Sequence, residues 1–197
     1  MILSNLEIIE CLKNKLFTIT PQPPIDASKA PYNTSAIDLS LGDEIVVPNS
    51  DSPIQIDLKK GGIAAFLSKH SKPHNISEDQ PFSLKKGIFV LGKTYESVDF
   101  PLDVGPPCYC ARVEGRSSFA RCGLLIHFTA PTIHCGFKGT ITLELINFGP
   151  NPILLYPKLP ICQLIIEQVS ERPYESANQF SGQSSAVGLP SAPSQKK

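Results

Sequence analysis

The sequence predicts a mainly β fold, a barrel or a sandwich built from many short strands. Nineteen prolines and thirteen glycines are spread along the 197 residues, and short strands joined by turns tolerate such residues far better than helices do. Apolar and polar residues alternate in several segments. Over residues 35–42, for example, alternation places Ile37, Leu39 and Leu41 on one face. Many short strands at this spacing are typical of a barrel or a sandwich.

The order of the elements follows from the same patterns. Residues 3–15 are expected to form a helix, because Ile8, Ile9 and Leu12 fall near helical spacing and Ser4 can cap its start. Shorter helical segments are expected over residues 63–68 and 116–121, and strands over residues 16–19, 35–42, 44–47, 82–91, 95–100, 108–113, 124–129, 141–147, 153–156 and 161–168.

Turn residues predict the connections between these elements. Residues 48–82 are polar and loop-like apart from the short helix. Glu114 and Gly115 are expected to form a tight turn, since glycine permits a sharp change of direction. Proline and glycine residues are expected to shape a hairpin over residues 129–139.

Length and composition indicate one domain over residues 1–171, followed by a tail over residues 172–197. Hydrophobic residues make up 41% of the chain and charged residues 18%, which is typical of a globular protein with a real core. The tail is rich in Ser, Gln, Gly and Pro and is expected to be mobile in the free protein.

Charge, hydropathy and cysteine usage argue against several classes of protein. The formal net charge is zero, whereas proteins that bind long nucleic acids usually carry a basic surplus. No segment reaches the roughly 18 apolar residues of a membrane span, and the N-terminus lacks the pattern of a signal peptide. A cytoplasmic protein is therefore expected. The six cysteines are expected to be free thiols, as is the default in a reducing compartment.

Residues 114–121, EGRSSFAR, form a candidate phosphate site. Ser117 and Ser118 supply hydroxyls, Arg116 and Arg121 supply guanidinium groups, and a helix start supplies free N–H groups. Fixed donors, positive charge and the positive end of a helix dipole together favour an anion. The alternative is a helix cap with solvated arginines.

Glu144 is the candidate general acid or base. Within residues 141–147, ITLELIN, alternation places Thr142 and Glu144 on one face and the apolar residues on the other. A carboxylate in so apolar a strand is unfavourable unless it is paired or solvated in a pocket, and a pocket is where proton transfer to a substrate takes place. The alternative is an exposed polar face on an edge strand.

Residues 129–139, TAPTIHCGFKG, are a candidate base-recognition segment. Backbone groups of a hairpin can bind the edge of a flat base, and Phe137 offers a wall or a stacking surface. His134 is a further candidate acid or base, and its alternative is a structural histidine.

Several catalytic motifs are missing. Zinc nucleobase deaminases carry H-x-E followed by P-C-x-x-C, whereas this chain has Cys108 and Cys110 in a C-x-C arrangement and no H-x-E. The histidines do not cluster with cysteines at ligand spacing, apart from the neighbours His134 and Cys135. A P-loop and a G-x-S-x-G elbow are also missing.

Taken in order, these segments resemble the dCTP deaminase family, part of the trimeric dUTPase-like superfamily. MILSNLEIIECL resembles its opening helix, SAIDLSLGDE its S-x-D-L-x-L-G strand, and EGRSSFARCGLLIHFTA its G-R-S-S-x-x-R-x-G-L core. GFKGTITLELIN resembles the segment with the catalytic glutamate, ICQLIIE the penultimate strand, and RPY followed by FSGQ the nucleotide-closing tail. The resemblance covers nearly the whole chain. It implies a dUTPase-like distorted β-barrel of the β-clip type, with a short N-terminal helix and one or two small helices.

The resemblance also implies an activity, the hydrolytic deamination of dCTP to dUTP and ammonia, which supplies dUTP for dTTP synthesis. Glu144 would shuttle protons while water attacks C4 of cytosine, with no metal at the base, and Arg121 and Ser117 would complete the catalytic set. The substrate-binding residues implied are Arg116, Ser118, Phe119, Ala120, Ala130, His134, Thr142, Leu143, Gln163, Tyr174, Gln179 and Gln183.

Partners follow from the resemblance in the same way. It implies a homotrimer with sites between subunits, a tail that closes over the nucleotide, and Mg²⁺ that is bound through the triphosphate, without zinc. Relatives suggest that dTTP can inhibit such an enzyme.

Two departures from the family pattern leave alternatives open. His134 stands where the family's I-D-x-G usually has an aspartate, which in dUTPases activates water for pyrophosphate hydrolysis. Gln179 stands near the place of a lysine that binds phosphates. The alternatives are a dUTP pyrophosphatase, a bifunctional dUMP-forming deaminase, and a non-catalytic nucleotide-binding homologue. The first two are disfavoured by His134, and the last by the retained Glu144 with its serines and arginines.

Overall fold

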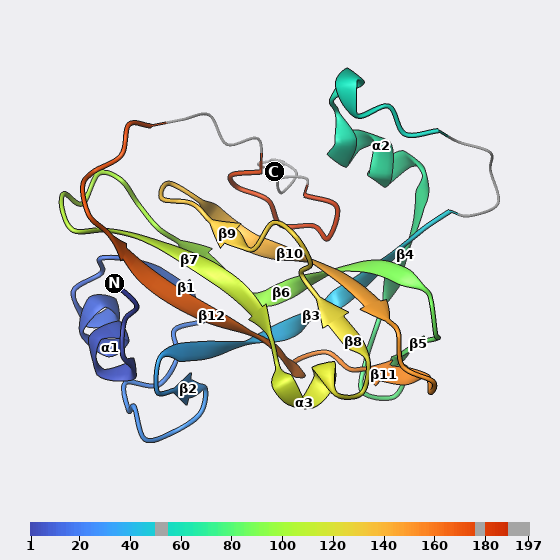
Figure 1. Ribbon diagram of the computed structural model, residues 1–197, viewed down its shortest axis with the longest axis horizontal. Coiled ribbons are helices and arrows are strands. Elements are labelled where there is room, and N and C mark those ends of the chain that lie inside the picture. The colour runs from blue at the N-terminus through green and yellow to red at the C-terminus, as the bar shows by residue number, and fades with distance from the viewer. Residues whose placement is uncertain (50–54, 176–179, 189–197) are drawn as a thin grey trace, which may run out of the picture.

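The computed structural model describes residues 1–49, 55–175 and 180–188 and is mainly β (Figure 1). Its elements are α1 (Asn5–Lys13), β1 (Thr18–Thr20), β2 (Tyr32–Asn33), β3 (Ala36–Pro48), η1 (Leu58–Lys60), α2 (Ile63–Lys69), β4 (Ser71–Asn75), β5 (Phe82–Leu84), β6 (Phe89–Asp99), β7 (Cys108–Gly115), α3 (Ser117–Ala120), β8 (Leu124–Ile126), β9 (Thr132–Ile133), β10 (Lys138–Asn147), β11 (Ile153–Leu155) and β12 (Pro160–Val169).

One large curled sheet carries the fold. Among the described residues it has ten strands, with the main order β8-β10-β6-β3-β12-β7-β9, and β11 and β5 form a separate pair. The sheet curls into a half-barrel, and β3 continues from one half of the sheet into the other by pairing with both β12 and β6. The prediction of a mainly β, barrel-like fold with a few short helices is confirmed.

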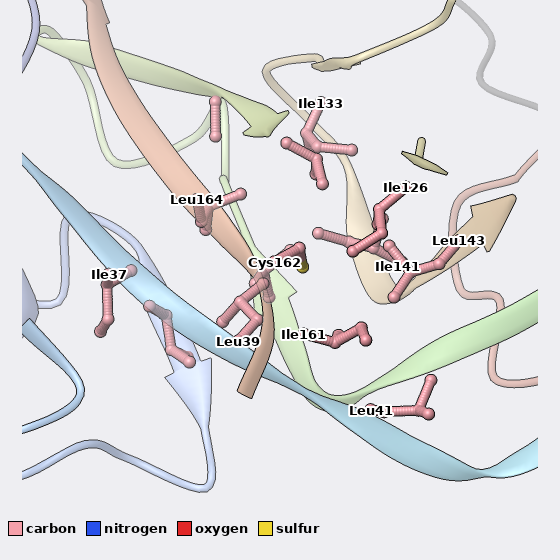
Figure 2. Close-up of a cluster of buried hydrophobic side chains, with 14 of the residues drawn as sticks. Ile37, Leu39, Leu41, Ile126, Ile133, Ile141, Leu143, Ile161, Cys162 and Leu164 are labelled. Atoms are coloured by element: carbon pink, nitrogen blue, oxygen red, sulfur yellow. The ribbon is translucent and has the colours of Figure 1, made fainter. Parts of the chain in front are cut away.

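Alternating side chains build the core inside this curl. Ile37, Leu39 and Leu41 of β3 are at most 1% exposed, as the alternation predicts, and they lie close to Ile161 and Leu164 of β12 (Figure 2). Burying one such side chain contributes about 1.5–3 kcal/mol relative to leaving it in water. The polar residues between them, Asp38 and Ser40, therefore face the other side of the sheet.

The helices are short and lie where the sequence predicts them. At the start of α1, Glu7 N–H donates to Ser4 Oγ, and Ser4 N–H donates in return to Glu7 Oε2. This reciprocal pair is a capping box, and it fixes the helix so that Ile8 and Leu12 are buried. No helix within the described ranges is long and apolar enough to cross a membrane.

Strand boundaries differ from the prediction where pairing overrides the local pattern. Residues 35–42 and 44–47 form the single strand β3, whose pairing with β6 shifts register between Leu41 and Ile45. Residues 82–91 are split into β5 and β6 by a turn at Gly87, whose φ is +74°. β6 then absorbs most of the strand expected over residues 95–100.

Three predicted connections differ in the structure. Gly115 does not form a tight turn: it is the last residue of β7 and pairs with Cys162 of β12. The segment over residues 129–139 is not a hairpin, because β9 pairs with β7 while β10 pairs with β6 and β8. The loop over residues 48–82 also contains β4, which pairs with β3. Its sequence, SKPHN, has no apolar alternation that would indicate a strand.

Candidate active site

A cavity of about 370 Å³ opens beside β10. Its walls come from β10, from the segments around β9, from α2 and from the described part of the tail, which Figure 1 shows close to β10. Ala130, His134, Thr142, Glu144 and Gln183, all predicted from the sequence, line this cavity. A single cavity thus gathers predicted residues from Ala130 to Gln183, which are far apart in the chain.

Glu144 lies on the wall of the cavity, as the alternation along β10 predicts. Its neighbours Leu143 and Leu145 are fully buried in the core, whereas the Glu144 side chain is 32% exposed. On the same face, Thr142 Oγ1 is buried and has no hydrogen-bond partner within the described chain. An unsatisfied buried hydroxyl is unfavourable, so it is a ready contact for a polar ligand beside the carboxylate.

His127 holds the Glu144 carboxylate, and the sequence did not single it out. Its Nδ1 lies 3.0 Å from Glu144 Oε2, and its ring is only 6% exposed. Its backbone N–H donates to Glu144 O at 2.8 Å. His127 has a φ of +58°, and this uncommon left-handed backbone turns the ring back toward β10.

The His127 ring faces an acceptor on each side. Nε2 lies 2.9 Å from Ala130 O, and because a carbonyl oxygen can only accept, Nε2 carries a proton. Nδ1 then faces the Glu144 carboxyl group at 3.0 Å. One further proton, on either the imidazole or the carboxyl group, is needed to make this contact attractive. Such a proton would also satisfy Nδ1, which is buried and has no hydrogen-bond partner within the described chain.

Hydrogen bonds to β10 dock the tail beside the cavity. Thr140 N–H donates to Gln183 O at 3.1 Å, and Gln183 Nε2 donates to Thr140 O at 2.7 Å. Gly182 N–H donates to Lys138 O. These bonds bury Gln183 to 6% exposure and bring it, with Phe180, to the wall of the cavity. Closure of the tail over a nucleotide stays a prediction.

A second clamp on the tail comes from β3 and β6. Lys93 Nζ donates to Ser184 O at 3.2 Å, and Glu44 Oε2 accepts from Ala186 N–H at 3.1 Å. Lys93 and Glu44 lie 3.5 Å apart and are about one fifth exposed. One ion pair thus engages a carbonyl and an amide of the same stretch of backbone.

Replacing Gly139 by alanine is expected to release the tail from β10. A Cβ at Gly139 would lie 2.5 Å from Gln183 O, and the φ of +138° is one that other residues rarely adopt. Because the clash is with backbone, the docked segment must move away. Amide exchange at Gly182 and Thr140 should rise by about tenfold or more, because their N–H groups donate across this contact to Lys138 O and Gln183 O. Gly87→Ala is the control, since Gly87 has a φ of +74° but nothing within 4 Å. Exchange at Gly182 and Thr140 equal to that of the wild type would contradict this contact.

The predicted phosphate segment lies around α3, away from the Glu144 cavity. Ser117, Ser118 and Arg121 are exposed. Phe119 and Arg121 line a different cavity of about 600 Å³. No residue lines both cavities. Within one chain, the structure therefore does not bring the serines and arginines together with Glu144.

The other predicted residues have varied surroundings. Ala120 ends α3 and is exposed, and the Leu143 side chain points into the core. Gln163 of β12 donates to Asp38 Oδ1 at 3.2 Å. Tyr174 is fully exposed, and Gln179 lies outside the described residues.

Metal-ligating groups are dispersed in the described part of the chain. There, no group of three or more His, Cys, Asp or Glu side chains could hold a metal ion. The six cysteines are free, and burial raises the pKa of the Cys135 thiol to about 11, which disfavours the thiolate that a metal needs.

Comparison with known proteins agrees with this architecture. A family described as dCTP deaminase-like matches residues 2–169. "dCTP deaminase, dUMP-forming" of Methanosphaera stadtmanae is 40% identical over 149 residues, 71% of this chain and 68% of that protein. "dCTP deaminase" of Shewanella frigidimarina is 34% identical over 195 residues, 95% and 96% of the two chains.

A solved structure supports the fold. The 2'-deoxycytidine 5'-triphosphate deaminase from Agrobacterium tumefaciens has a TM-score of 0.62 at 17% identity, over 85% of this chain. This chain spans about half (48%) of that longer one. With a family match over most of its length and relatives at this level of identity, the chain belongs to the dCTP deaminase-like family.

Proposed function

We propose that this protein is a hydrolytic dCTP deaminase that converts dCTP to dUTP and ammonia, with Glu144 as its general acid and base. The observation that carries the proposal is the cavity in which Glu144 lies beside His127, with Nδ1 3.0 Å from Oε2. A carboxyl group with a protonated partner can both take and give a proton, as deamination requires.

The chemistry needs two proton transfers. The oxygen of water forms a bond with C4 of cytosine, and the bond between C4 and the exocyclic nitrogen breaks. Of the two water protons, one ends on N3 of the product and the other on the leaving ammonia. Glu144 would carry them, and His127 would hold the carboxyl group toward C4. The unpaired hydroxyl of Thr142 supports recognition of the base beside it.

The complete site in this proposal spans two subunits of a homotrimer. Ser117, Ser118 and Arg121 of one copy would bind the triphosphate, with its Mg²⁺, at the Glu144 cavity of the next copy. The separation of the two clusters within one chain supports this arrangement. Two exposed serines and an exposed arginine are the expected form of a half-site that a second copy completes.

A dUMP-forming enzyme is the second candidate. It is favoured by the relative from Methanosphaera stadtmanae, which carries that name. Against it stands His134, an exposed residue of the cavity, at the position where an aspartate would activate water for pyrophosphate release. The deamination step is the same in both candidates, and they differ in the product.

The test is product analysis after incubation with dCTP and Mg²⁺. We expect one ammonia and one dUTP for each dCTP consumed. If dUMP and pyrophosphate appear together with ammonia, the dUMP-forming alternative is correct. Tight binding of dCTP without any ammonia would reject the enzymatic proposal and favour a nucleotide-binding homologue. Adding dTTP to the same assay tests for the inhibition that the family resemblance suggests.

A further inference from the structure

A polar row crosses three strands on the side of the sheet opposite the core. Asp38 of β3 pairs in register with Gln163 of β12, and Gln163 pairs with Glu114 of β7. Their neighbours along the strands, such as Ile37 and Leu164, are buried in the core. Asp38 is the least accessible acid of this row, with a side chain only 15% exposed.

The Asp38 carboxylate is held by three side-chain donors. Asn33 Nδ2 and Gln163 Nε2 donate to Oδ1 at 2.8 and 3.2 Å, and Arg116 Nη1 lies 3.3 Å from Oδ2. These donors come from β2, from β12 and from the residue that caps α3. A carboxylate so engaged within its own chain serves as a local anchor rather than as a ligand for substrate.

Arg116 is fixed from several directions but keeps free donors. Besides Asp38, its Nη1 donates to Pro160 O at 3.1 Å, and its guanidinium lies 5.6 Å from the centre of the Phe119 ring. Both polar contacts use Nη1, and a guanidinium has five N–H donors in a rigid fork. The remaining donors are therefore held in a constant direction. Gln163, which uses its amide nitrogen on Asp38, likewise keeps its carbonyl oxygen available.

We propose that Asp38 is a positioning residue that orients Arg116 and Gln163 toward the nucleotide. This inference rests on the proposed function, together with the expectation from the family resemblance that Arg116 and Gln163 contact dCTP. Asp38 links these two residues through one carboxylate, although Gln163 lies on β12 and Arg116 follows β7. It acts through them and does not touch the substrate.

The direction in which the Kd for dCTP changes when Asp38 is replaced distinguishes this role from a simple charge effect. Asp38 is an anion near residues that are to bind a polyanion, so removing its charge without any loss of orientation would tighten binding of dCTP. If Asp38 positions Arg116 and Gln163, the loss of orientation outweighs that gain and binding weakens. A purely structural role would lower stability and leave binding of dCTP unchanged.

The experiment is Asp38→Asn in the full chain, with the Kd of Mg²⁺-dCTP measured by calorimetry and KM and kcat measured from ammonia release. We expect Kd and KM to rise about tenfold or more, as for the loss of a charge-assisted hydrogen bond, with kcat changed much less. Asp38→Glu, which restores the charge, should recover part of the affinity. Glu167→Gln is the matched control, because it breaks another arginine–carboxylate pair of the same sheet, with Arg112 at 2.6 Å, between β12 and β7. It should leave Kd unchanged.

A double-mutant comparison tests whether Asp38 acts through Arg116. Asp38→Asn should weaken binding much less when it is added to Arg116→Gln than when it is made alone. If Asp38→Asn does not fold, Asn33→Ala removes one anchor of the same carboxylate and should raise Kd in the same direction. A Kd that is unchanged or lowered in the folded variants overturns the inference. A wild type that binds dCTP without releasing ammonia rejects the proposed reaction but leaves this binding test intact.

Discussion

Glu144→Gln is expected to lower kcat for ammonia release by about 10³-fold, within the range typical of a lost general acid or base. The amide keeps the size of the side chain and can still contact His127, but it cannot take a proton from water or give one to the leaving ammonia. KM should change little, because the carboxyl group acts mainly while C4 changes its bonding.

The measurement is steady-state ammonia release at saturating dCTP, together with binding of dCTP to show that the cavity is intact. Glu10→Gln is the control: Glu10 lies on α1 and is 62% exposed in an ion pair with Lys13, so its loss should not affect turnover. If Glu144→Gln releases ammonia as fast as the wild type, the assignment of Glu144 is wrong and another group must move the protons.

Gly123→Ala is expected to produce the largest loss of stability among the substitutions considered. Gly123 has a φ of +91°, and a Cβ there would lie 2.2 Å from Gly149 N and 2.4 Å from Gly149 Cα. The two loops are also joined by a hydrogen bond from Phe148 N–H to Gly123 O at 2.8 Å. The added Cβ would clash with backbone atoms, which cannot rotate out of the way as a side chain can. The two loops must therefore separate, and this hydrogen bond breaks.

Two effects of the substitution destabilise the folded state: the left-handed backbone at an alanine, and the overlap of its Cβ with Gly149. Each costs about 1–3 kcal/mol. The free energy of unfolding should fall by about 3 kcal/mol, and for a chain of this size the Tm should fall by about 10 °C. Thermal and urea unfolding followed by circular dichroism would measure both. Gly105→Ala is the control, because Gly105 has a φ of +79° with nothing within 4 Å. A Gly123→Ala variant no less stable than Gly105→Ala would contradict the contact.

The sequence predicts best those features that depend on one strand. The side of β10 that carries Glu144 follows from alternation alone, as does the burial of Ile37 and Leu39 in β3. The N-terminal helix follows from its own capping box. In each case, the residues that decide the outcome are neighbours in the chain.

Features that depend on which strands become neighbours could not be predicted. His127 reaches Glu144 because β8 pairs with β10, and Asp38 reaches Gln163 because β3 pairs with β12. Neither strand pairing can be recognised from the local alternation of apolar and polar residues. Gly115 was expected to turn because glycine can, but pairing with β12 keeps it extended. Likewise, the sequence did not predict that Arg121 and Glu144 line different cavities.

The clamp formed by Lys93 and Glu44 grips the tail by its main chain, at the carbonyl of Ser184 and the amide of Ala186. The position of the tail therefore depends on Lys93 of β6 and Glu44 of β3, on the hydrogen bonds to β10 and on the burial of Ala186, whereas the Ser184 side chain takes no part in this clamp. Over evolutionary time, the identity of a residue such as Ser184 can drift at little cost, as long as the backbone keeps its course. Lys93 and Glu44 cannot be replaced as easily. Changing either residue removes a hydrogen bond to the tail backbone, and no substitution in the tail can restore it.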